Sequence, residues 1–501
     1  MTSTWKNKLY FGDNLDIMRN HIADESVDLI YLDPPFNSKA SYNVLFGEAN
    51  GTQSAAQITA FEDTWHWGHE SEQSYLELVT QGPKRLADLI QAFRSFLGTN
   101  DMMAYLVMMA IRLVEMHRVL KATGSIYLHC DPTASHYLKL LLDAVFGAEQ
   151  FLNEIVWYYG PKATQRSISF QRKHDIIFYY AKRQGKHIFT PLLQDYSKGS
   201  LAERETRYKY EDECGKYRLT TRRRTDGTKY RAKVYLKEGV VMTDVWEIPI
   251  INSTAKERLG YPTQKPEALL ERIIKASSNE GDIVMDPFCG CGTTIVVAER
   301  FNRRWIGIDI THLAITLMKQ RLQDTFGPYL SSYEVIGDPK DLQGARALAE
   351  QDRYQFEWWA LGKVGARPAQ DKKKGADSGI DGFVYFIDDN SGKAKTIVVS
   401  VKSGHVTVSQ IRDLKGVLER ENAAIGVFIT LQEPTNPMME EAAASGFYEP
   451  EFFHGKFPKV QILTIEEILN GKQIEYPRKD TGVTFKKASR KGKESERTSL
   501  F

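Results

Sequence analysis

The sequence predicts an α/β protein with a doubly wound sheet, followed by a smaller α/β/α domain. Short apolar runs of strand length alternate with segments of helical period over about the first 330 residues, which is typical of strands joined by helices. Two of these runs end in an acid and a proline, at Asp33-Pro34 and Asp286-Pro287, where open α/β sheets place their chemistry. The alternation restarts after Asp338-Pro339, so a second domain is expected.

The composition is that of a globular protein. A chain of 501 residues, 42% of them hydrophobic, is long enough for several domains. Its formal charge of +2 neither predicts nor excludes a polyanionic partner, so only local basic patches bear on DNA binding. Cys130, Cys214, Cys289 and Cys291 form no CxxC pair, and no signal peptide or run of about 18 apolar residues is present. We therefore expect a soluble, reduced, cytoplasmic protein with no membrane partner.

The stretch Val27–Asn37 is expected to carry the chemistry. It predicts a buried strand that delivers a stiff loop, Asp33-Pro34-Pro35-Phe36. Asp33 and the Pro34 carbonyl offer two acceptors, and Phe36 offers a flat apolar face beside them. An exocyclic amino group on a nucleobase satisfies all three features, although proline pairs also simply end strands.

A second motif indicates a cofactor site. Residues 282–294 read as a strand, an acid, a glycine loop and a helix start. Gly290 and Gly292 allow a sharp turn and close approach to a ligand, and the N–H groups of Thr293 and Thr294 point the same way. Trp305–Asp309 predicts a neighbouring strand whose final acid is placed for ribose hydroxyls. The spacing is neither GxGxxG nor a P-loop.

These two motifs resemble those of the S-adenosylmethionine-dependent DNA amino-methyltransferases. Asp33–Phe36 is similar to their catalytic tetrapeptide, and Asp286–Thr294 closely resembles the loop that holds the methionine part of the cofactor. The order of the motifs resembles the circularly permuted β class, in which a segment like Thr263–Pro266 precedes the cofactor loop. The resemblance covers about residues 7–325 and implies a Rossmann-like methyltransferase sheet.

The resemblance implies roles for individual residues. Asp33, Pro34, Pro35 and Phe36 are the catalytic set, acting on a base that has left the duplex. The expected contacts to S-adenosylmethionine are Asp13, Thr263, Lys265, Asp286, Phe288, Cys289, Gly290, Gly292, Thr293 and Asp309. Asp13 is either an adenine contact or a helix N-cap. No metal is required for the transfer.

Three further stretches have open assignments. Residues 37 to roughly 100 are expected to form a long, weakly patterned excursion serving as a lid or DNA arm, with Lys39 as a DNA contact. Its aromatic cluster at 61–67 either stacks on bases or packs against the domain. His129, Cys130 and Asp131 follow a predicted strand, and either line the pocket or simply end the strand.

The segment from about 183 to 245 predicts a DNA target-recognition insert. Basic residues interleave with tyrosines here, and they include Arg222, Arg223 and Arg224. Such a composition suits contacts to phosphates and bases, although a solvated charged face has the same appearance.

The second domain is predicted from a helix at 345–361, paired strands at 379–386 and 396–402, a helix at 408–421 and a strand at 425–430. It resembles the Mrr type of restriction-endonuclease-like fold. The resemblance makes Glu357, Asp381, Lys402 and Gln410 a candidate nuclease site with Mg²⁺. Ser400 departs from the pattern, because it stands where an acid or glutamine is expected. The domain is therefore an active nuclease, a degenerate DNA-binding form, which we favour, or an interaction domain.

The predicted limits are 1–182 for the catalytic half, 183–245 for the insert, 246–330 for the cofactor-binding half, 340–476 for the second domain and 477–501 for a disordered basic tail. The expected function is adenine-N6 methylation of double-stranded DNA in restriction-modification or phage defence, with a homodimer or partner subunits as further expectations. Asp-Pro-Pro-Phe favours adenine N6 over cytosine N4. Cytosine-N4 methylation and a silent, DNA-binding methyltransferase core are the alternatives.

Overall fold

The protein is described from a computed structural model. The structure describes residues 5–35, 41–47, 53–62, 65–160, 170–196, 204, 206–237, 239–252, 254–259, 261, 263–369, 379–388, 394–450, 455–477 and 488–494, with backbone alone for 41–47 and 53–62.

A nine-stranded sheet forms the centre of the molecule, in the order β13-β6-β7-β5-β2-β14-β15-β1-β16. Its strands are β1 (Asn7–Phe11), β2 (Val27–Leu32), β5 (Leu120–Cys130), β6 (Phe151–Tyr158), β7 (His174–Ala181), β13 (Val245–Glu247), β14 (Ile283–Asp286), β15 (Arg304–Asp309) and β16 (Tyr333–Ile336). All neighbouring strands are parallel except where β7 meets β5 and β6. The predicted strands are thus present, in an α/β arrangement.

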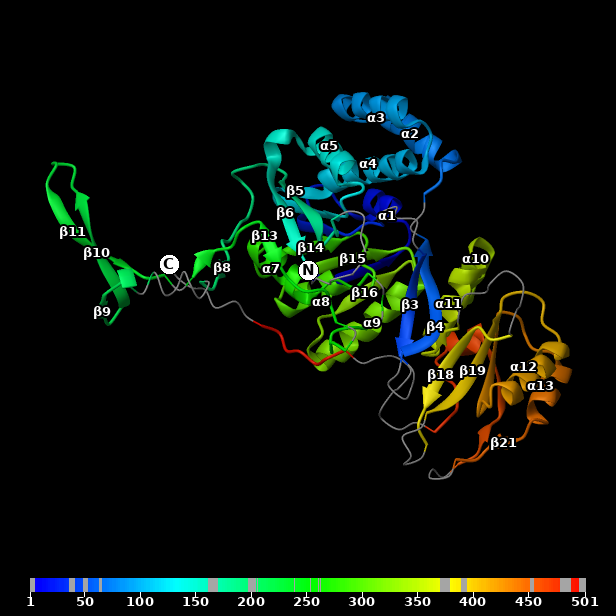
Figure 1. The fold of residues 1–501 in the computed structure, drawn as a ribbon. Coiled ribbons are helices and arrows are strands. Elements are labelled where there is room, and N and C mark those ends of the chain that lie inside the picture. The colour runs from blue at the N-terminus through cyan, green and yellow to red at the C-terminus, as the bar shows by residue number, and fades with distance from the viewer. Residues whose placement is uncertain are drawn as a thin grey trace.

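Helices cover both faces of this sheet (Figure 1). They are α1 (Asn14–His21), α2 (His69–Gln81), α3 (Lys84–Leu97), α4 (Asp101–Val119) and α5 (Ser135–Phe146) on one face, and α7 (Glu267–Ser277), α8 (Thr293–Arg300) and α9 (His312–Phe326) on the other. Ile30 and Leu32 of β2 join the first core, while Leu29 and Tyr31 join the second, because successive side chains of a strand point to opposite faces. The sheet is therefore doubly wound.

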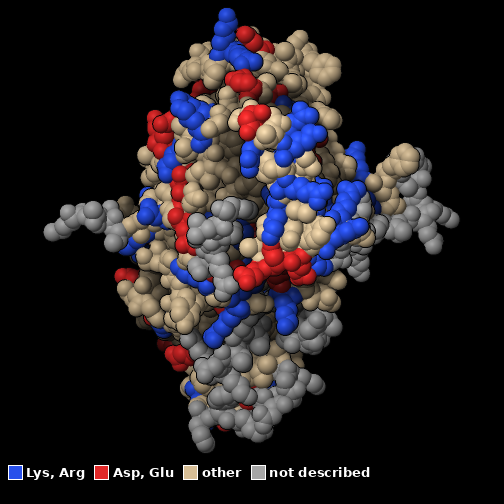
Figure 2. All heavy atoms as spheres, turned by 90° about the vertical axis from the view of Figure 1, so that its left-hand side faces the viewer, with Lys and Arg blue, Asp and Glu red and all other residues tan. Residues whose placement is uncertain are grey.

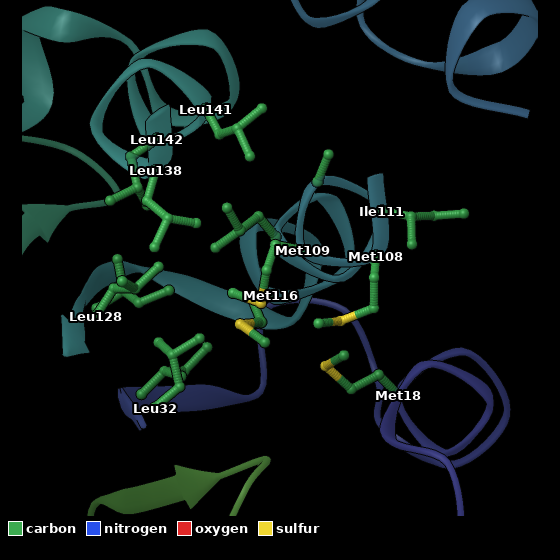
Figure 3. Close-up of a cluster of buried hydrophobic side chains, with 14 of the residues drawn as sticks. Met18, Leu32, Met108, Met109, Ile111, Met116, Leu128, Leu138, Leu141 and Leu142 are labelled. Carbon is green, nitrogen blue, oxygen red and sulfur yellow. The ribbon is translucent and has the colours of Figure 1, made fainter. Parts of the chain in front are cut away.

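Helix α4 is the centre of the first core. Asn100 caps its start by accepting a hydrogen bond from the Met103 N–H at 2.9 Å. Met109 and Met116 lie toward leucines of β2, β5 and α5, and Met108 lies beside Met18 of α1 (Figure 3), where unbranched thioether side chains fill irregular gaps. This packing fixes α4 directly beside the strand that ends at Asp33.

The segment from 37 to roughly 100, expected to be a long, weakly patterned excursion, contains regular elements over most of its described length. The strands β3 (Ser41–Gly47) and β4 (Gln53–Glu62) form an antiparallel hairpin, and α2 and α3 follow. The helices form because Leu78, Leu86 and Ile90 recur at helical spacing and are buried against the α4 side of the core. Phe36 and Lys39 lie outside the described residues.

The insert between β7 and β13 extends away from the main sheet (Figure 1). Its strands are β8 (Leu193–Gln194), β9 (Tyr210–Asp212), β10 (Gly215–Arg223), β11 (Lys229–Tyr235) and β12 (Val240–Val241). β11, β10 and β9 form an antiparallel sheet, and β8 pairs with β12 near the insert's base. The Tyr210 and Tyr217 rings stack at 5.5 Å, and Tyr217 packs against Tyr235 at 5.5 Å.

The second domain is an α/β/α sandwich, as predicted. Its strands are β17 (Arg367–Pro368), β18 (Gly382–Phe386), β19 (Lys395–Lys402), β20 (Ile425–Thr430) and β23 (Val460–Thr464), with a small pair formed by β21 (Phe447–Tyr448) and β22 (Phe457–Pro458). Its helices are α10 (Leu342–Gln351), α11 (Arg353–Lys363), α12 (Val408–Arg420), α13 (Asn436–Ala443) and α14 (Ile465–Leu469). α10, α11 and α14 pack on one face of the sheet, and α12 and α13 pack on the other.

The single helix predicted for 345–361 is two helices in the structure. Asp352 separates α10 from α11 and accepts hydrogen bonds from the N–H groups of Tyr354 and Gln355. An acid that satisfies two N–H groups at a helix start favours a new helix over continuation of the old one.

The second domain packs directly on the cofactor-binding half. The rings of Phe11 and His312 stack with centroids 3.5 Å apart, and Phe11 also packs against the core of the second domain. Gln355 accepts a hydrogen bond from the His312 N–H at 3.1 Å. The α11 helix therefore contacts the start of α9 at His312, which follows the end of β15 at Asp309 after a short turn.

The prediction of a wholly disordered tail fails for residues 488–494. Lys491 donates its backbone N–H to the Thr325 carbonyl at 3.0 Å, and Glu494 donates to the Arg300 carbonyl at 2.8 Å. The segment is held in place because these carbonyls lie at the ends of α9 and α8, where the last carbonyls of a helix have no partner within the helix.

No helix within the part of the chain that the structure describes is long and apolar enough to cross a membrane.

Candidate active site

A cavity of about 280 Å³ lies at the carboxyl ends of β1, β2, β14 and β15. It brings together most of the predicted catalytic and cofactor residues, namely Asp13, Asp33, Pro34, Pro35, Thr263, Lys265, Asp286, Phe288, Cys289, Gly290, Thr293 and Asp309. Trp65 also lines the cavity. Parallel strands end at the same edge of the sheet, so segments more than 250 residues apart meet here.

The two carboxylate oxygens of Asp33 have different surroundings. Its Oδ2 contacts Lys265 Nζ, and its side chain is only 14% exposed. Oδ1 is buried and accepts no hydrogen bond from the described residues. Because a buried carboxylate oxygen without a donor is costly, this atom is a strong candidate for contact with a bound ligand.

Asp286 anchors the cofactor loop from within the protein. Its Oδ1 accepts the Phe288 N–H at 3.1 Å, and its Oδ2 accepts the Thr294 hydroxyl at 2.5 Å. Burial raises the pKa of Asp286 to about 7, against the lowering effect of these two hydrogen bonds, and the charges of Asp33 and Asp309 raise it further.

The raised pKa of Asp286 predicts a pH-dependent stability. The folded protein keeps a proton that the unfolded chain releases near pH 3.8, so this residue lowers stability as pH rises from about 4 to about 7. Asp286→Asn removes that slope while keeping hydrogen-bonding groups. Urea unfolding at several pH values is expected to show the variant gaining stability relative to wild type as pH rises across this window. If the free energies of unfolding of the two proteins changed in parallel with pH, the raised pKa of Asp286 would be contradicted.

The glycine loop approaches its surroundings closely. Gly290 and Gly292 have φ of 48° and 75°, in the left-handed region that side chains rarely adopt. A Cβ on Gly292 would lie 2.6 Å from Met318 Cγ, and one on Gly290 would lie 3.2 Å from the Tyr261 ring. Gly290 therefore presents its backbone to the cavity, whereas Gly292, a predicted cofactor contact, is buried and does not line the cavity. The N–H groups at the start of α8 favour a ligand acceptor.

Gly292→Ala is expected to weaken cofactor binding by at least about tenfold and to lower stability by about 1–3 kcal/mol. The new methyl group strains φ and displaces Met318. Calorimetric titration with S-adenosylmethionine and urea unfolding measure the two effects. Gly281→Ala is the control, because φ is also positive at 82° but no atom lies within 4 Å of the new Cβ. Equal affinity losses in the two variants would contradict a role for close approach.

Asp309 and Asp13 border the cavity with local bonds of their own. Asp309 Oδ2 accepts the Gly290 N–H at 2.9 Å, and Oδ1 accepts the Thr311 N–H and hydroxyl at 2.9 and 3.0 Å. Burial raises the pKa of Asp309. Asp13 caps α1 through the Leu15 N–H at 2.8 Å and also lines the cavity, so the two alternatives for this residue are compatible.

Sequence reasoning missed two residues that connect these parts. Arg112 donates Nη2 to Asp13 Oδ2 at 2.5 Å and Nε to Asn14 Oδ1 at 2.6 Å. Asn14 in turn donates to the Pro287 carbonyl at 2.8 Å. Both line the cavity, and no local pattern marks them, because their partners lie about 100 and 270 residues away.

A buried network of charged side chains contacts the glycine loop on the side of α7, α8 and α9. Arg321 donates to the Cys291 carbonyl at 3.1 Å, to the Thr293 hydroxyl at 3.0 Å and to Glu267 Oε1 at 3.2 Å. Arg300 Nη1 reaches Glu267 Oε2 at 3.0 Å. This network was also not expected from the sequence.

One of the residues predicted either to line the pocket or to end a strand, His129, is fully buried and lies outside the cavity lining.

The candidate nuclease residues are only partly brought together. Asp381 Oδ2 accepts hydrogen bonds from the Val401 N–H at 2.7 Å, the Ser400 hydroxyl at 3.2 Å and Lys402 Nζ at 3.3 Å. Gln410 caps α12 instead, by accepting the Thr407 N–H at 2.8 Å. Glu357 is buried on α11. In the described part of the chain, no three His, Cys, Asp or Glu side chains cluster as metal ligands.

The insert carries its basic residues at the end of a hairpin. Arg222, Arg223 and Arg224 are all exposed, and Arg222 and Arg223 pair across the strands with Tyr230 and Lys229. Figure 2 shows lysine and arginine side chains gathered on the side of the molecule from which the insert projects, with acidic groups among them. These positions leave the guanidinium groups accessible to a polyanion.

The fold and the cavity define an α/β protein with a ligand-sized cavity at the carboxyl edge of its sheet. The model of the DNA methylase family matches residues 27–320, more than half of the chain, and the chain belongs to that family. A restriction endonuclease family model matches residues 352–456. Both resemblances drawn from the motifs are thus confirmed.

Several known proteins are similar to this chain. Type II methyltransferase M.HpaI of Haemophilus parainfluenzae is 34% identical over 217 residues, 43% of this chain and 59% of M.HpaI. DNA adenine methyltransferase YhdJ of Escherichia coli K12 is 32% identical over 212 residues, 42% of this chain and 64% of YhdJ. The solved PvuII cytosine-N4-specific DNA methyltransferase aligns with a TM-score of 0.35 and 14% identity, over 63% of this chain and 86% of that one.

Proposed function

We propose that the protein transfers a methyl group from S-adenosylmethionine to N6 of adenine in double-stranded DNA. The observation that carries the proposal is the open Oδ1 of Asp33, buried beside the glycine loop and without a hydrogen-bond donor among the described residues. An amino group supplies such a donor. Lys265 occupies the other oxygen of Asp33, so Oδ1 is the atom left for the amine.

The cavity suits the proposed cofactor. Gly290 lines the cavity at a point where a Cβ would crowd Tyr261, whereas Gly292 is buried against Met318 and does not line it. The backbone at Gly290 gives a cradle for the methionine part. Asp309 and Asp13 place carboxylates at the ends of β15 and β1, where they meet hydroxyl and amino groups of an adenosine. When bound, S-adenosylmethionine supplies a methyl group already activated on sulfur.

The contribution of the protein is then positioning and electrostatics. Asp33 Oδ1 and the Pro34 carbonyl orient the amine, and Asp33 disperses the positive charge that develops on nitrogen. The predicted stacking of Phe36 on the extruded base completes this arrangement. Adenine is favoured by the Asp-Pro-Pro-Phe tetrapeptide and by the similarity to the DNA adenine methyltransferase YhdJ.

Nucleoside mass spectrometry tests the base and the activity together. Unmethylated DNA is incubated with purified protein and methyl-labelled S-adenosylmethionine. Label in N6-methyladenine is the expected result. Label in N4-methylcytosine would overturn the base assignment while keeping the mechanism, and absence of label would favour a silent core.

We infer that the insert supplies DNA contacts through Arg222, Arg223 and Arg224. Replacing all three with alanine is expected to reduce the slope of log affinity against log salt by about 2–3, because each phosphate contact releases about one counterion. Filter binding across a salt series measures it. Arg85→Ala, exposed on α3, is the control, and an unchanged slope in the triple variant would contradict the inference.

For the second domain we propose a degenerate nuclease fold that binds DNA. Ser400 replaces an expected ligand and instead donates to Asp381, whose Oδ2 also accepts from Val401 and Lys402. Fewer oxygen ligands weaken a Mg²⁺ site. DNA that stays intact with Mg²⁺ but binds less tightly to Lys402→Ala supports this proposal, whereas Mg²⁺-dependent fragments assign an active nuclease. A restriction-modification role, with partner subunits or a homodimer, is part of the same proposal.

A further inference from the structure

A chain of buried polar groups leads from Asp33 away from the cavity. His129 at the end of β5 is fully buried. Its Nδ1 lies 2.9 Å from the Tyr31 hydroxyl and 3.7 Å from Asp33 Oδ1, and its Nε2 lies 3.2 Å from Asp175 Oδ2. The open oxygen of Asp33 therefore faces an imidazole that is itself paired with a second carboxylate.

The surroundings of His129 define how its ring is held. Tyr31 and Asp33 face it from β2 and the following loop, and Asp175 faces it from β7. From β6 the edge-on ring of Trp157, 5.4 Å away, adds no ionisable group. The Asp175 carboxylate keeps the proton of a neutral ring on Nε2, which leaves the lone pair of Nδ1 toward Tyr31 and Asp33.

Methylation of an amine requires a proton to leave. As the new N–C bond forms and the S–C bond breaks, the nitrogen becomes positively charged and must lose one N–H proton. Asp33 Oδ1 is placed to accept it, while Lys265 contacts Oδ2. Asp33 must lose this proton again before the next turnover, and a neighbouring base would take it.

Resting on the proposed function, we propose that His129 is this base and acts through Asp33. The amine N–H bond breaks and an Asp33 O–H bond forms; that bond breaks and a His129 Nδ1–H bond forms. Asp175 stabilises the resulting imidazolium, as a carboxylate does in other Asp–His pairs. When product leaves, the His129 Nδ1–H bond breaks and the proton returns through Asp33 to water in the cavity, so one proton is set free for each methyl group transferred. The relay requires the Tyr31 hydroxyl to move off Nδ1 and the 3.7 Å gap to close, and catalytic hydrogen bonds are often long without substrate.

Two variants test the relay in the full-length protein. His129→Gln cannot take up a proton, and its single-turnover rate of methyl transfer is expected to fall by roughly 10- to 100-fold. Its affinities for S-adenosylmethionine and DNA are expected to stay within about twofold, since His129 does not line the cavity. His136→Gln, exposed on α5, is the matched control and is expected to match wild type.

Asp175→Asn keeps a hydrogen-bond acceptor but removes the negative charge beside the ring. Because the protonated ring loses that stabilisation, the acid limb of the rate–pH profile is expected to move to lower pH. A purely structural role for His129 would not shift this limb.

The outcomes separate cleanly. A His129→Gln protein with wild-type rate, or an Asp175→Asn protein with an unmoved limb, overturns the relay while the proposed function stands. Joint loss of rate, cofactor affinity and melting temperature in His129→Gln assigns the residue to folding and also overturns it. A wild-type protein that methylates no base overturns the proposed function, and the relay with it.

Discussion

Asp33→Ala is expected to lower the rate of methyl transfer by at least about a thousandfold while leaving affinity for S-adenosylmethionine within about twofold. The substitution removes Oδ1, the buried oxygen without a hydrogen-bond donor among the described residues that we propose accepts the amine. The cofactor loop, which is held by Asp286 and Asp309, keeps its own bonds. Single-turnover assays with labelled cofactor and equilibrium titration measure the two quantities.

Asp131→Ala is the matched control for this experiment. Asp131 also follows a strand of the same sheet, β5, but it does not line the cavity, and its oxygens accept hydrogen bonds from Thr133. We expect near wild-type transfer. Because loss of Asp33 also removes a partner of Lys265, Asp33→Asn is the companion variant that preserves size. If either Asp33 variant lost cofactor binding and transfer together, the assignment of Asp33 to the amine would be wrong.

Glu267→Ala is expected to have the largest effect on stability, about 3–5 kcal/mol. Glu267 is 6% exposed and meets three cations, Arg300 at 3.0 Å, Arg321 at 3.2 Å and Lys491 at 2.6 Å. Its removal takes away the carboxylate that the buried Arg321 guanidinium contacts, and it leaves Arg300 with the more exposed Glu271 and Glu494. Urea unfolding followed by circular dichroism measures the loss.

The pH dependence of this loss follows from the titration of Glu267. Burial alone would raise the pKa of this carboxyl, but Arg321, Lys491 and Arg300 together lower it. Its stabilising effect is therefore fully present above the ordinary value of 4.5 and is lost as pH falls further. The difference between wild type and Glu267→Ala should accordingly shrink in acid.

Glu271→Ala provides the comparison, because Glu271 contacts the same Arg300 with a side chain that is 32% exposed. Solvent already screens that pair, and a loss of about 1 kcal/mol or less is expected. Similar losses in the two variants would show that burial of Glu267 is not what makes its contacts strong.

Much of the site could be predicted because its residues stand at the ends of short apolar runs. Asp33, Asp286 and Asp309 each follow a buried strand, and parallel order then brings them to one edge of the sheet. The glycine loop was recognisable for the same reason, since a left-handed backbone next to a helix start calls for glycine at Gly292. These are local signals, carried by neighbouring residues.

Other expectations failed where one local sequence pattern is compatible with more than one structural role. Gln410 has the spacing of a helix residue near the nuclease motif, yet its side chain completes a capping box with Thr407. The segment after residue 37 was expected to be irregular, although Leu86 and Ile90 place α3 in the core. Packing against the rest of the protein decided these cases, and no window of sequence contains that packing.

The sequence by itself determined the strands that surround the site, the acids at the strand ends and the position of the glycine loop, because hydrophobic period and turn chemistry act over a few residues. Only the tertiary structure decided which charges meet. Arg112 reaches Asp13, His129 lies between Asp33 and Asp175, and Lys491 neutralises Glu267. Such pairs form because the core buries distant segments together, and a buried charge is stable only beside a partner.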